Sequence, residues 1–407
     1  MGGKKSKSAA PAAAAAAAAP DESVESEPVA KKELPTVVAT NVAGLPESAR
    51  DSFADAGFSP EDGDAHFSAL CAVLKITHKI RVVASEGEEA AAPAGSDTDD
   101  GRSTLTSAGK AEIAKHTVEK PLKVFKLEKA PAGKGGFGQV FKAKDKSQKG
   151  SPWVAVKKSL NKSPTQKLVN TVEIGALTEL QHDNLVKYHR AFPVVTKAGD
   201  EELWLVLEFM EGGTIAEASK KQKFKDEDVA YVAREMMQGL KYMHSMNFIH
   251  RDLKSMNIML DITGAVKLID FGLCAKLPSA ETKVKGLCGS PFWMPPEMVQ
   301  GKLHGQTADT WSMAVSLIEM SQGKAPNSSF DKFKVLYTIA AHGIDVPEGV
   351  GDKFSSFLGE CLKMNPDERP LPATLLDHEY IATASGKPQM VEILRSIFLS
   401  DAFATMF

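Results

Sequence analysis

The chain has 407 residues, of which 43% are hydrophobic and 25% charged, an ordinary composition for folded domains and enough length for two or three compact units. The formal net charge of −3 gives no overall basic field, which argues against nucleic acid as a partner. The four cysteines lie far apart without a CxxC pair, an arrangement that fits neither a disulfide framework nor a zinc site and indicates a reducing, intracellular compartment.

Residues 1–43 are expected to form a disordered tail, because an alanine run and an acidic stretch bury almost no apolar surface. The chain starts with MGGKKS, which matches the pattern for myristoylation of Gly2, and nearby lysines would add the electrostatic attraction that one acyl chain needs. A flexible tail without a lipid is the alternative. No run of about 18 uncharged apolar residues occurs, so we expect a cytoplasmic protein that contacts membranes peripherally only if Gly2 is acylated.

A small helical module is predicted for residues 44–84. Phe67, Leu70, Cys71 and Leu74 follow the i, i+3, i+4, i+7 spacing that places side chains on one face of a helix. This pattern indicates a short amphipathic helix with an apolar face to bury.

A second ordered region is expected from about residue 118 onward. Residues 85–117, rich in acids, glycines and small side chains, predict a linker that leads to it. At the far end, residues 382–407 contain MVEILRSIFL, whose apolar spacing predicts an amphipathic helix that packs on the preceding domain.

A glycine-rich segment, GKGGFGQV, lies between two strand-like runs, VFKLEKA and VFKAKD. Glycines allow the backbone to approach phosphate oxygens without a clash with a Cβ atom. Dinucleotide-binding folds use a similar spacing, but there a helix follows the glycines, whereas here a strand follows. The candidate cofactor-binding residues of this segment are Gly133, Lys134, Gly135, Gly136, Phe137, Gly138 and Val140.

Lys157 lies in a strand-like run, WVAVKKSL, in the V-A-V-K context that pairs with the α- and β-phosphates of a nucleotide. A lone lysine in a strand would otherwise be an ordinary solvated side chain. The helix predicted after it carries Glu173, which is placed to form a salt bridge with Lys157 and hold it toward ATP.

Two further motifs follow in the order that phosphoryl transfer requires. The run HRDLKSMN supplies Asp252 as acceptor of the substrate proton, Lys254 as a charge near the transferred group, and Asn257 as a magnesium ligand. The later run DFG supplies Asp270 as the second magnesium ligand, with Phe271 as a packing element. Each triplet alone occurs by chance, but four motifs in the correct order and spacing do not.

Over residues 118–381 the chain resembles eukaryotic protein kinases of the serine/threonine type. The phrases EELWLVLEFMEGGTI, GSPFWMPPEMV, DTWSMAVSLIEM and CLKMNPDERP are most similar to the sterile-twenty family, in particular its PAK branch. The resemblance implies an α+β, two-lobe protein kinase fold, with a small β-rich lobe at 118–209 and a larger helical lobe at 210–381.

The same resemblance implies an adenine site. Leu207 would be the gatekeeper, the Glu208 carbonyl and the Met210 amide would bind adenine, and three apolar side chains would sandwich the ring: Val140, Ala155 and Met259. It also implies two structural contacts, a pair of Glu297 with Arg369 and an anchor for the catalytic loop, Asp309.

The segment between the DFG and PPE motifs departs from the family. Ser290 stands where relatives carry a threonine that helps to seat the substrate, but Gly286 replaces a phosphorylatable threonine. In the family that phosphate binds the arginine of HRD, here Arg251. Three alternatives remain open: order without a phosphate, a phosphate on Thr282 or Ser279, or control by the N-terminal module. We favour activity that does not depend on a phosphate at the usual site.

Residues 44–84 resemble the segment that follows the GTPase-binding motif in PAK enzymes, which folds onto the kinase and inhibits it. The GTPase-binding motif itself is not found before Gly44, so a direct link to a Rho-type GTPase is less favoured than autoinhibition. The alternative is a helical module with an unrelated role.

The predicted reaction is transfer of the γ-phosphoryl group of Mg-ATP to a serine or threonine hydroxyl of a protein substrate, with ATP and Mg²⁺ as cofactors. Two rival interpretations compete with this reaction. A pseudokinase scaffold would lack turnover, but the catalytic residues are intact. A membrane-tethered adaptor would act mainly through its first 118 residues.

Overall fold

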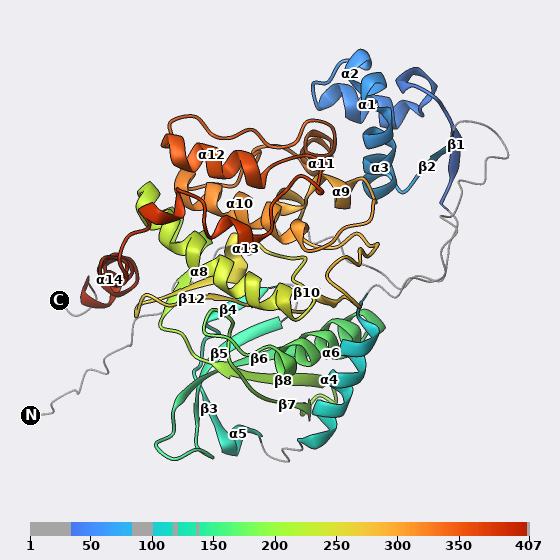
Figure 1. Cartoon of the computed structure of the whole chain (residues 1–407). Coiled ribbons are helices and arrows are strands. Elements are labelled where there is room, and N and C mark those ends of the chain that lie inside the picture. The colour runs from blue at the N-terminus through green and yellow to red at the C-terminus, as the bar shows by residue number, and fades with distance from the viewer. Residues whose placement is uncertain (1–33, 84–100, 117–120, 136–137, 405–407) are drawn as a thin grey trace, which may run out of the picture.

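The computed structural model describes residues 34–83, 101–116, 121–135 and 138–404, with side chains at 134–135 and 400–404 left aside. It has two lobes joined by a short connection, with a separate N-terminal module on the larger lobe (Figure 1). The predicted two-lobe kinase fold is therefore confirmed. Gly2, Gly136 and Phe137 lie outside the described residues, as does most of the predicted tail.

The small lobe is built on a twisted antiparallel sheet with the strand order β3-β5-β6-β8-β7, and β4 also pairs with β5. Phe125, Phe192 and Trp204 stack on one face, with ring centroids about 6 Å apart, and form its apolar core. A short helix, α5 (Pro121–Val124), precedes the sheet. The strands are β3 (Phe125–Leu127), β4 (Gly133–Gly135), β5 (Gly138–Asp145), β6 (Trp153–Leu160), β7 (Tyr188–Val195) and β8 (Glu201–Glu208).

Helix α6 (Pro164–Glu179) crosses the small lobe beside this sheet (Figure 1). Its start is well defined, because the Ser163 hydroxyl accepts from the Gln166 amide while the Gln166 side chain accepts from the Ser163 amide. This capping box, with Pro164 in the first turn, stabilises the helix start. Glu173 is buried on its inner face.

The large lobe is mostly helical and surrounds α10 (Thr307–Gln322), which is buried along nearly its whole length. The other helices are α7 (Ile215–Lys221), α8 (Asp226–Ser245), α9 (Pro296–Val299), α11 (Lys332–Ala341), α12 (Asp352–Cys361) and α13 (Pro372–Leu375). Single 3-10 turns are η2 (Ser255–Asn257), η3 (Pro291–Trp293) and η4 (Ile381–Thr383).

Short strands of the large lobe face the small lobe and carry the catalytic loops between them. They are β9 (Gly212–Thr214), β10 (Phe248–Ile249), β11 (Ile258–Asp261), β12 (Val266–Leu268) and β13 (Ala275–Lys276). The pairs β9–β11, β11–β12 and β10–β13 are all antiparallel. These ladders fix the ends of the loops that hold the candidate active site.

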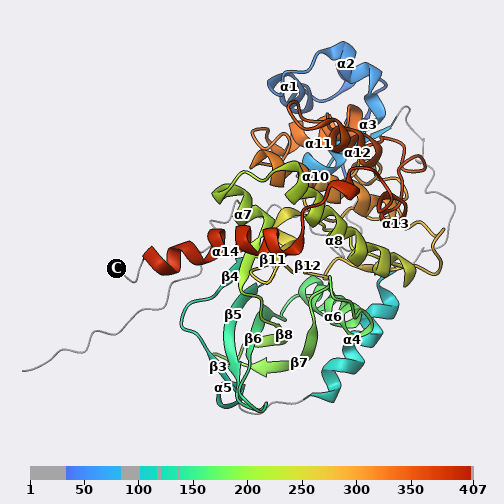
Figure 2. The same cartoon turned by 60° about the vertical axis from the view of Figure 1, so that its left-hand side comes forward.

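The predicted C-terminal helix is present as α14 (Lys387–Ala404). Figure 2 shows it running beside α7 at the side of the molecule. Met390, Leu394 and Ile397 are buried, so this helix packs on the large lobe as the apolar spacing indicates. No helix in the described ranges is both long and apolar enough to cross a membrane.

The N-terminal module contains α1 (Glu47–Asp55), α2 (Pro60–Ala65) and α3 (Phe67–Thr77). The helix predicted there is present as α3, with Leu70 and Leu74 of the predicted face buried and Phe67 and Cys71 partly buried. The predicted start at residue 44 is wrong, because β1 (Thr36–Val38) pairs in parallel with β2 (Arg81–Val83) and is followed by η1 (Val42–Gly44). Residues 36–43 therefore belong to the module rather than to the tail.

The predicted linker at 85–117 is wrong in its second half, where α4 (Ser103–Lys115) lies along α6 (Figure 1). Leu105 is fully buried in this contact, and the Tyr188 hydroxyl donates to Glu112 at 3.0 Å. A helix rich in small and polar residues is held here by packing on a neighbour, which overrides its weak apolar pattern.

Candidate active site

Lys157 of β6 and Glu173 of α6 form a buried ion pair, with the lysine Nζ 2.7 and 2.9 Å from the two carboxylate oxygens. The same Nζ lies 3.1 Å from Oδ1 of Asp270. Burial would lower the pKa of Lys157, but the charges of Asp270 and Glu173 outweigh it and raise the pKa above its ordinary value. The lysine therefore stays charged at the position that the sequence analysis assigned to the phosphates.

The glycine-rich segment forms a hairpin of β4 and β5, in which Gly133 pairs with Val140 and Gly135 with Gly138. A strand follows the glycines, as the sequence analysis expected. Gly138 has φ +142°, and a Cβ there would lie 2.2 Å from the Lys158 carbonyl oxygen, so only glycine fits. Around Gly133 no atom lies within 4 Å of a Cβ position, which leaves space above the hairpin backbone.

The residues expected around adenine lie on neighbouring strands. Ala155 on β6 pairs with Leu207 on β8, and Val140 on β5 pairs with Lys157 on β6. Met210 is buried just beyond β8, and Met259 lies on β11 opposite Thr214. The Glu208 carboxylate accepts from the Lys187 amide and pairs with Lys267 at 2.7 Å, which fixes the segment that joins the lobes.

The catalytic loop forms one connected polar network. The Ser290 hydroxyl donates to Oδ1 of Asp252 at 3.0 Å and accepts from Nζ of Lys254 at 2.9 Å. Lys254 also lies 3.2 Å from Oδ2 of Asp252. Asn257 donates from its amide nitrogen to the carbonyl and to Oδ2 of Asp252, at 2.8 and 3.1 Å.

Two carboxylates of the site, the buried Asp252 and the partly exposed Asp270, have opposite pKa shifts. Burial raises the pKa of Asp252 above its ordinary value, and the charge of Lys254 offsets only part of this rise. Burial alone would also raise the pKa of Asp270, but the charges of Lys157 and Lys254 lower it overall. Asp270 is therefore the more firmly ionised group, as a cation ligand requires.

Asp309 anchors the catalytic loop from below. Its carboxylate accepts from the backbone amides of His250 and Arg251, at 2.9 and 3.0 Å, and contacts His244 Nε2 at 2.9 Å. Arg251 and Asp270 have φ of 65° and 64°, a left-handed conformation that is strained for these residues. Asp309 thus has the anchoring position that the family resemblance implied, whereas no sequence motif indicated His244.

Arg251 binds the start of the activation segment directly. Its Nε donates to the Leu273 carbonyl at 2.7 Å, and a terminal nitrogen donates to the Cys274 carbonyl at 3.4 Å. Gly286 has φ +152° and nothing within 4 Å of a Cβ position. The Ser279 and Thr282 hydroxyls lie 3.0 Å apart in a turn of their own.

The end of this segment is held to the large lobe. Val284 forms an antiparallel bridge with His304, whose ring is buried and was not singled out by the sequence analysis. Further on, Glu297 and Arg369 form a buried two-pronged ion pair at 2.8 and 3.1 Å, as the resemblance implied.

A small antiparallel sheet over a helical lobe, with a lysine, two carboxylates and an asparagine between them, defines a two-lobe phosphotransferase fold. The chain belongs to the protein kinase family, because the family described as protein kinase domain matches residues 127–381. This range agrees with the predicted domain except for its first nine residues.

Its relatives include three named serine/threonine kinases. The probable serine/threonine-protein kinase mkcB of Dictyostelium discoideum is 43% identical over 273 residues, 66% of this chain and 37% of that protein. Serine/threonine-protein kinase pakC of the same organism is 34% identical over 286 residues, 69% of this chain and 58% of pakC. Serine/threonine-protein kinase shk1/pak1 of Schizosaccharomyces pombe is 34% identical over 269 residues, 65% of this chain and 40% of that protein.

These similarities confirm the resemblance to serine/threonine kinases of the PAK and sterile-twenty type. The similarity covers less than two thirds of the length of each of these relatives.

Proposed function

We propose that this chain is a serine/threonine protein kinase that transfers the γ-phosphoryl group of ATP to hydroxyl groups of protein substrates. One observation carries the proposal: Lys157 contacts Glu173 and Asp270 at once, so the phosphate-binding lysine, its helix partner and a metal-binding carboxylate are already assembled. This arrangement is the one required for phosphoryl transfer in protein kinases. A pseudokinase scaffold would not need it.

Asp252 is proposed to orient the substrate hydroxyl and accept its proton. Its carboxylate is held by Ser290 and Asn257, so that its direction is set before a substrate binds. Lys254 lies between Asp252 and Ser290 and would neutralise charge on the transferred group. These contacts support the proposed role of Ser290 in seating the substrate.

The site suits Mg²⁺ and ATP. Asp270 offers a firmly ionised carboxylate, and Asn257 donates from its amide nitrogen to the carbonyl and the carboxylate of Asp252, which leaves the amide oxygen for a cation. Oxygen ligands of this kind are those that Mg²⁺ prefers, and the bound ion would neutralise phosphate charge. The hairpin of β4 and β5 would cover the phosphates with backbone amides.

The adenine ring is proposed to lie between the two lobes, with Leu207 as gatekeeper. The Glu208 carbonyl and the Met210 amide would bind its polar edge. The apolar side chains proposed to sandwich the ring are Val140, Ala155 and Met259.

The N-terminal module is proposed to regulate access of protein substrates. It packs on α9 and α11 of the large lobe, away from α6. The Lys157–Glu173 pair in the small lobe is intact while the module is in this position. Inhibition by this module would therefore act on the docking of substrates and not by dismantling the phosphate site. A cytoplasmic location, acylation of Gly2 and a link to a Rho-type GTPase remain proposals that rest on the sequence alone.

The test is a transfer assay with radiolabelled ATP, Mg²⁺ and a Ser/Thr peptide library, using the purified full chain. Lys157→Met and Asp270→Ala should each lower transfer by about a hundredfold or more, because each removes charge stabilisation at the phosphates. Lys158→Met is the matched control, since the next side chain on a strand points to the opposite face. Lys158 stacks over Trp204 instead, at 4.1 Å from its ring centroid. Wild-type transfer by Lys157→Met would refute the proposal.

A further inference from the structure

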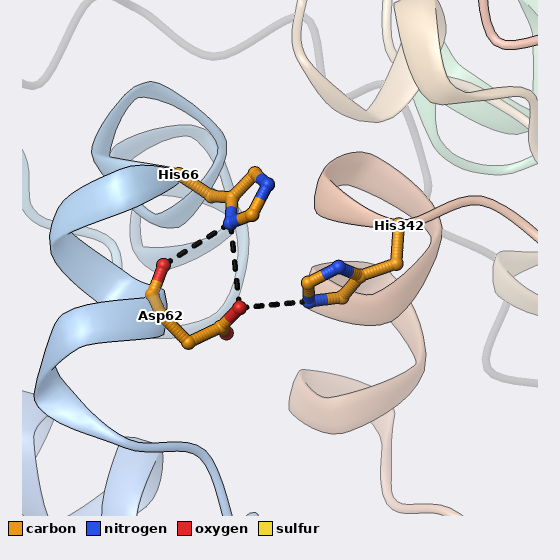
Figure 3. Close-up of side chains that lie close together, drawn as sticks. All are labelled: Asp62, His66 and His342. Carbon is orange, nitrogen blue, oxygen red and sulfur yellow. Dashed lines mark hydrogen bonds and ion pairs between the residues drawn. The ribbon is translucent and has the colours of Figure 1, made fainter.

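Two histidines and an aspartate meet where the N-terminal module touches the large lobe. Asp62 belongs to α2, His66 directly follows α2, and His342 directly follows α11 (Figure 3). Each residue offers one ligand atom, and the three atoms lie within 4.8 Å of one another. The cluster therefore brings together Asp62 and His342, which are 280 positions apart in the chain.

Two of the three spacings in the cluster, those from the Asp62 carboxylate to each imidazole, suit metal ligation better than hydrogen bonding. Oδ1 of Asp62 lies 3.4 Å from Nδ1 of His66 and 3.3 Å from Nε2 of His342. Both distances exceed the range of about 2.7 to 3.2 Å that N–H···O hydrogen bonds occupy. Ligand atoms at the usual zinc distances of about 2.0 to 2.1 Å lie roughly 3.3 to 3.4 Å apart around a tetrahedral ion.

The carboxylate is oriented by a buried tyrosine. The Tyr337 hydroxyl, on α11, lies 2.9 Å from Oδ2 of Asp62 and donates to it, so that Oδ1 faces the two imidazole rings. Carboxylates that bind metals are commonly held by such a partner. Nδ1 of His66 also lies 3.1 Å from the Asp62 carbonyl, and this contact must give way when the nitrogen uses its lone pair for an ion.

Two imidazoles and one carboxylate select a particular kind of cation. Imidazole nitrogen suits zinc and neighbouring transition metals, whereas Mg²⁺ and Ca²⁺ prefer sites made of oxygen atoms. The side chains are partly exposed, Asp62 by 25%, His66 by 36% and His342 by 39%, so an ion can enter from solvent. A water molecule can then complete four-coordinate geometry.

We propose that Asp62, His66 and His342 bind one divalent cation of the zinc class, which fastens the N-terminal module to the large lobe. The ligands come from both sides of this contact, so the ion binds only when the module is docked. By mass action, the ion therefore stabilises the docked state. Aromatic packing of Phe53 and Phe58 around Tyr337 holds the same surface without the ion, which explains why the ligands are already gathered.

The test uses the full chain, stripped of metal with a chelator and then titrated with Co²⁺ alone, without nucleotide or Mg²⁺. Wild type should bind one equivalent with the visible absorption of four-coordinate Co²⁺, and Zn²⁺ should displace it. His66→Ala and His342→Ala should each lose this equivalent. His189→Ala, at an exposed histidine of the small lobe, is the matched control and should retain it.

Two further measurements separate ligation from a general loss of structure. Tyr337→Phe keeps the ring but removes the hydroxyl, and should weaken Co²⁺ binding by about 10 to 100-fold. Zn²⁺ should raise the unfolding midpoint of wild type and of His189→Ala, but not of His66→Ala or His342→Ala. Equal Co²⁺ binding in wild type and in both histidine variants, or no bound equivalent in wild type, would overturn the proposal.

Discussion

Gly175 of α6 lies so close to Leu105 of α4 that a Cβ atom on Gly175 would be 2.1 Å from the Leu105 carbonyl oxygen. The contact is reciprocal, because a Cβ on Gly109 of α4 would be 1.9 Å from the carbonyl oxygen of Thr171. Two helix backbones meet here at a point where only glycine leaves enough room. Since α6 also carries Glu173, this crossing supports the residue that holds Lys157.

The first prediction concerns this crossing. Gly175→Ala and Gly109→Ala should each force the two helices apart, lower stability by about 1 to 3 kcal/mol, and reduce phosphoryl transfer as Glu173 shifts. Gly359→Ala is the matched control, because this exposed glycine of α12 has open space at its Cβ position. In that helix alanine should stabilise by about 0.5 to 1 kcal/mol. Thermal unfolding and a transfer assay measure both effects.

A Gly175→Ala variant that behaves like Gly359→Ala would contradict this role of α4.

The catalytic core could be predicted from sequence because its chemistry is local. Asp252, Lys254 and Asn257 lie within six residues, and their spacing alone brings them around one point. The glycine-rich segment is likewise separated from Lys157 by a single hairpin. The helix that follows Lys157 carries its acidic partner. Short connections leave few ways to arrange such groups, so order along the chain specifies position.

The parts that sequence could not predict depend on distant partners. Strand β1 is only three residues long and is a strand only because it pairs with β2, more than forty positions later. Helix α4 has few apolar residues, and its contact with α6 relies on glycines, which normally weaken a helix prediction. No motif in the sequence includes His304, and nothing there indicated that it would be buried against the activation segment.

The second prediction concerns activation without a phosphate. Arg251 already donates to the Leu273 and Cys274 carbonyls, so the start of the segment is held without a phosphate. Thr282→Ala should therefore retain activity within about twofold, because it removes only a surface turn contact with Ser279. The measurement is transfer by chain treated with phosphatase.

Ser290→Ala provides the contrast in the same segment. It removes the hydroxyl that bridges Asp252 and Lys254, and should lower transfer by about 10 to 100-fold. If Thr282→Ala instead abolished transfer, and phosphatase treatment did the same to wild type, activation would depend on a phosphate at Thr282.

The third prediction concerns pH and His304, which is fully buried and, within the described part of the chain, has no hydrogen bond of standard geometry at either ring nitrogen. Burial and then the nearby charge of Arg251 lower its pKa from 6.5 to about 4, while the Lys302 backbone and then the charge of Asp309 oppose the shift. Above pH 6.5 the ring is neutral in both folded and unfolded chains, so it has no effect on stability there. Between pH 6.5 and 4 only the unfolded chain takes up the proton, so stability falls as pH falls, by up to about 1.4 kcal/mol per pH unit.

His304→Leu removes the titrating group and keeps an apolar side chain of similar size. The difference in unfolding free energy between wild type and this variant, measured by denaturant titration, should be constant from pH 8 to about 7 and should then shift in favour of the variant as pH falls toward 4. The other titratable groups are the same in both proteins, so their contributions cancel in the difference in unfolding free energy. A difference that stays flat over this range would mean that His304 titrates alike in the folded and unfolded chains, so that its burial does not exclude the proton.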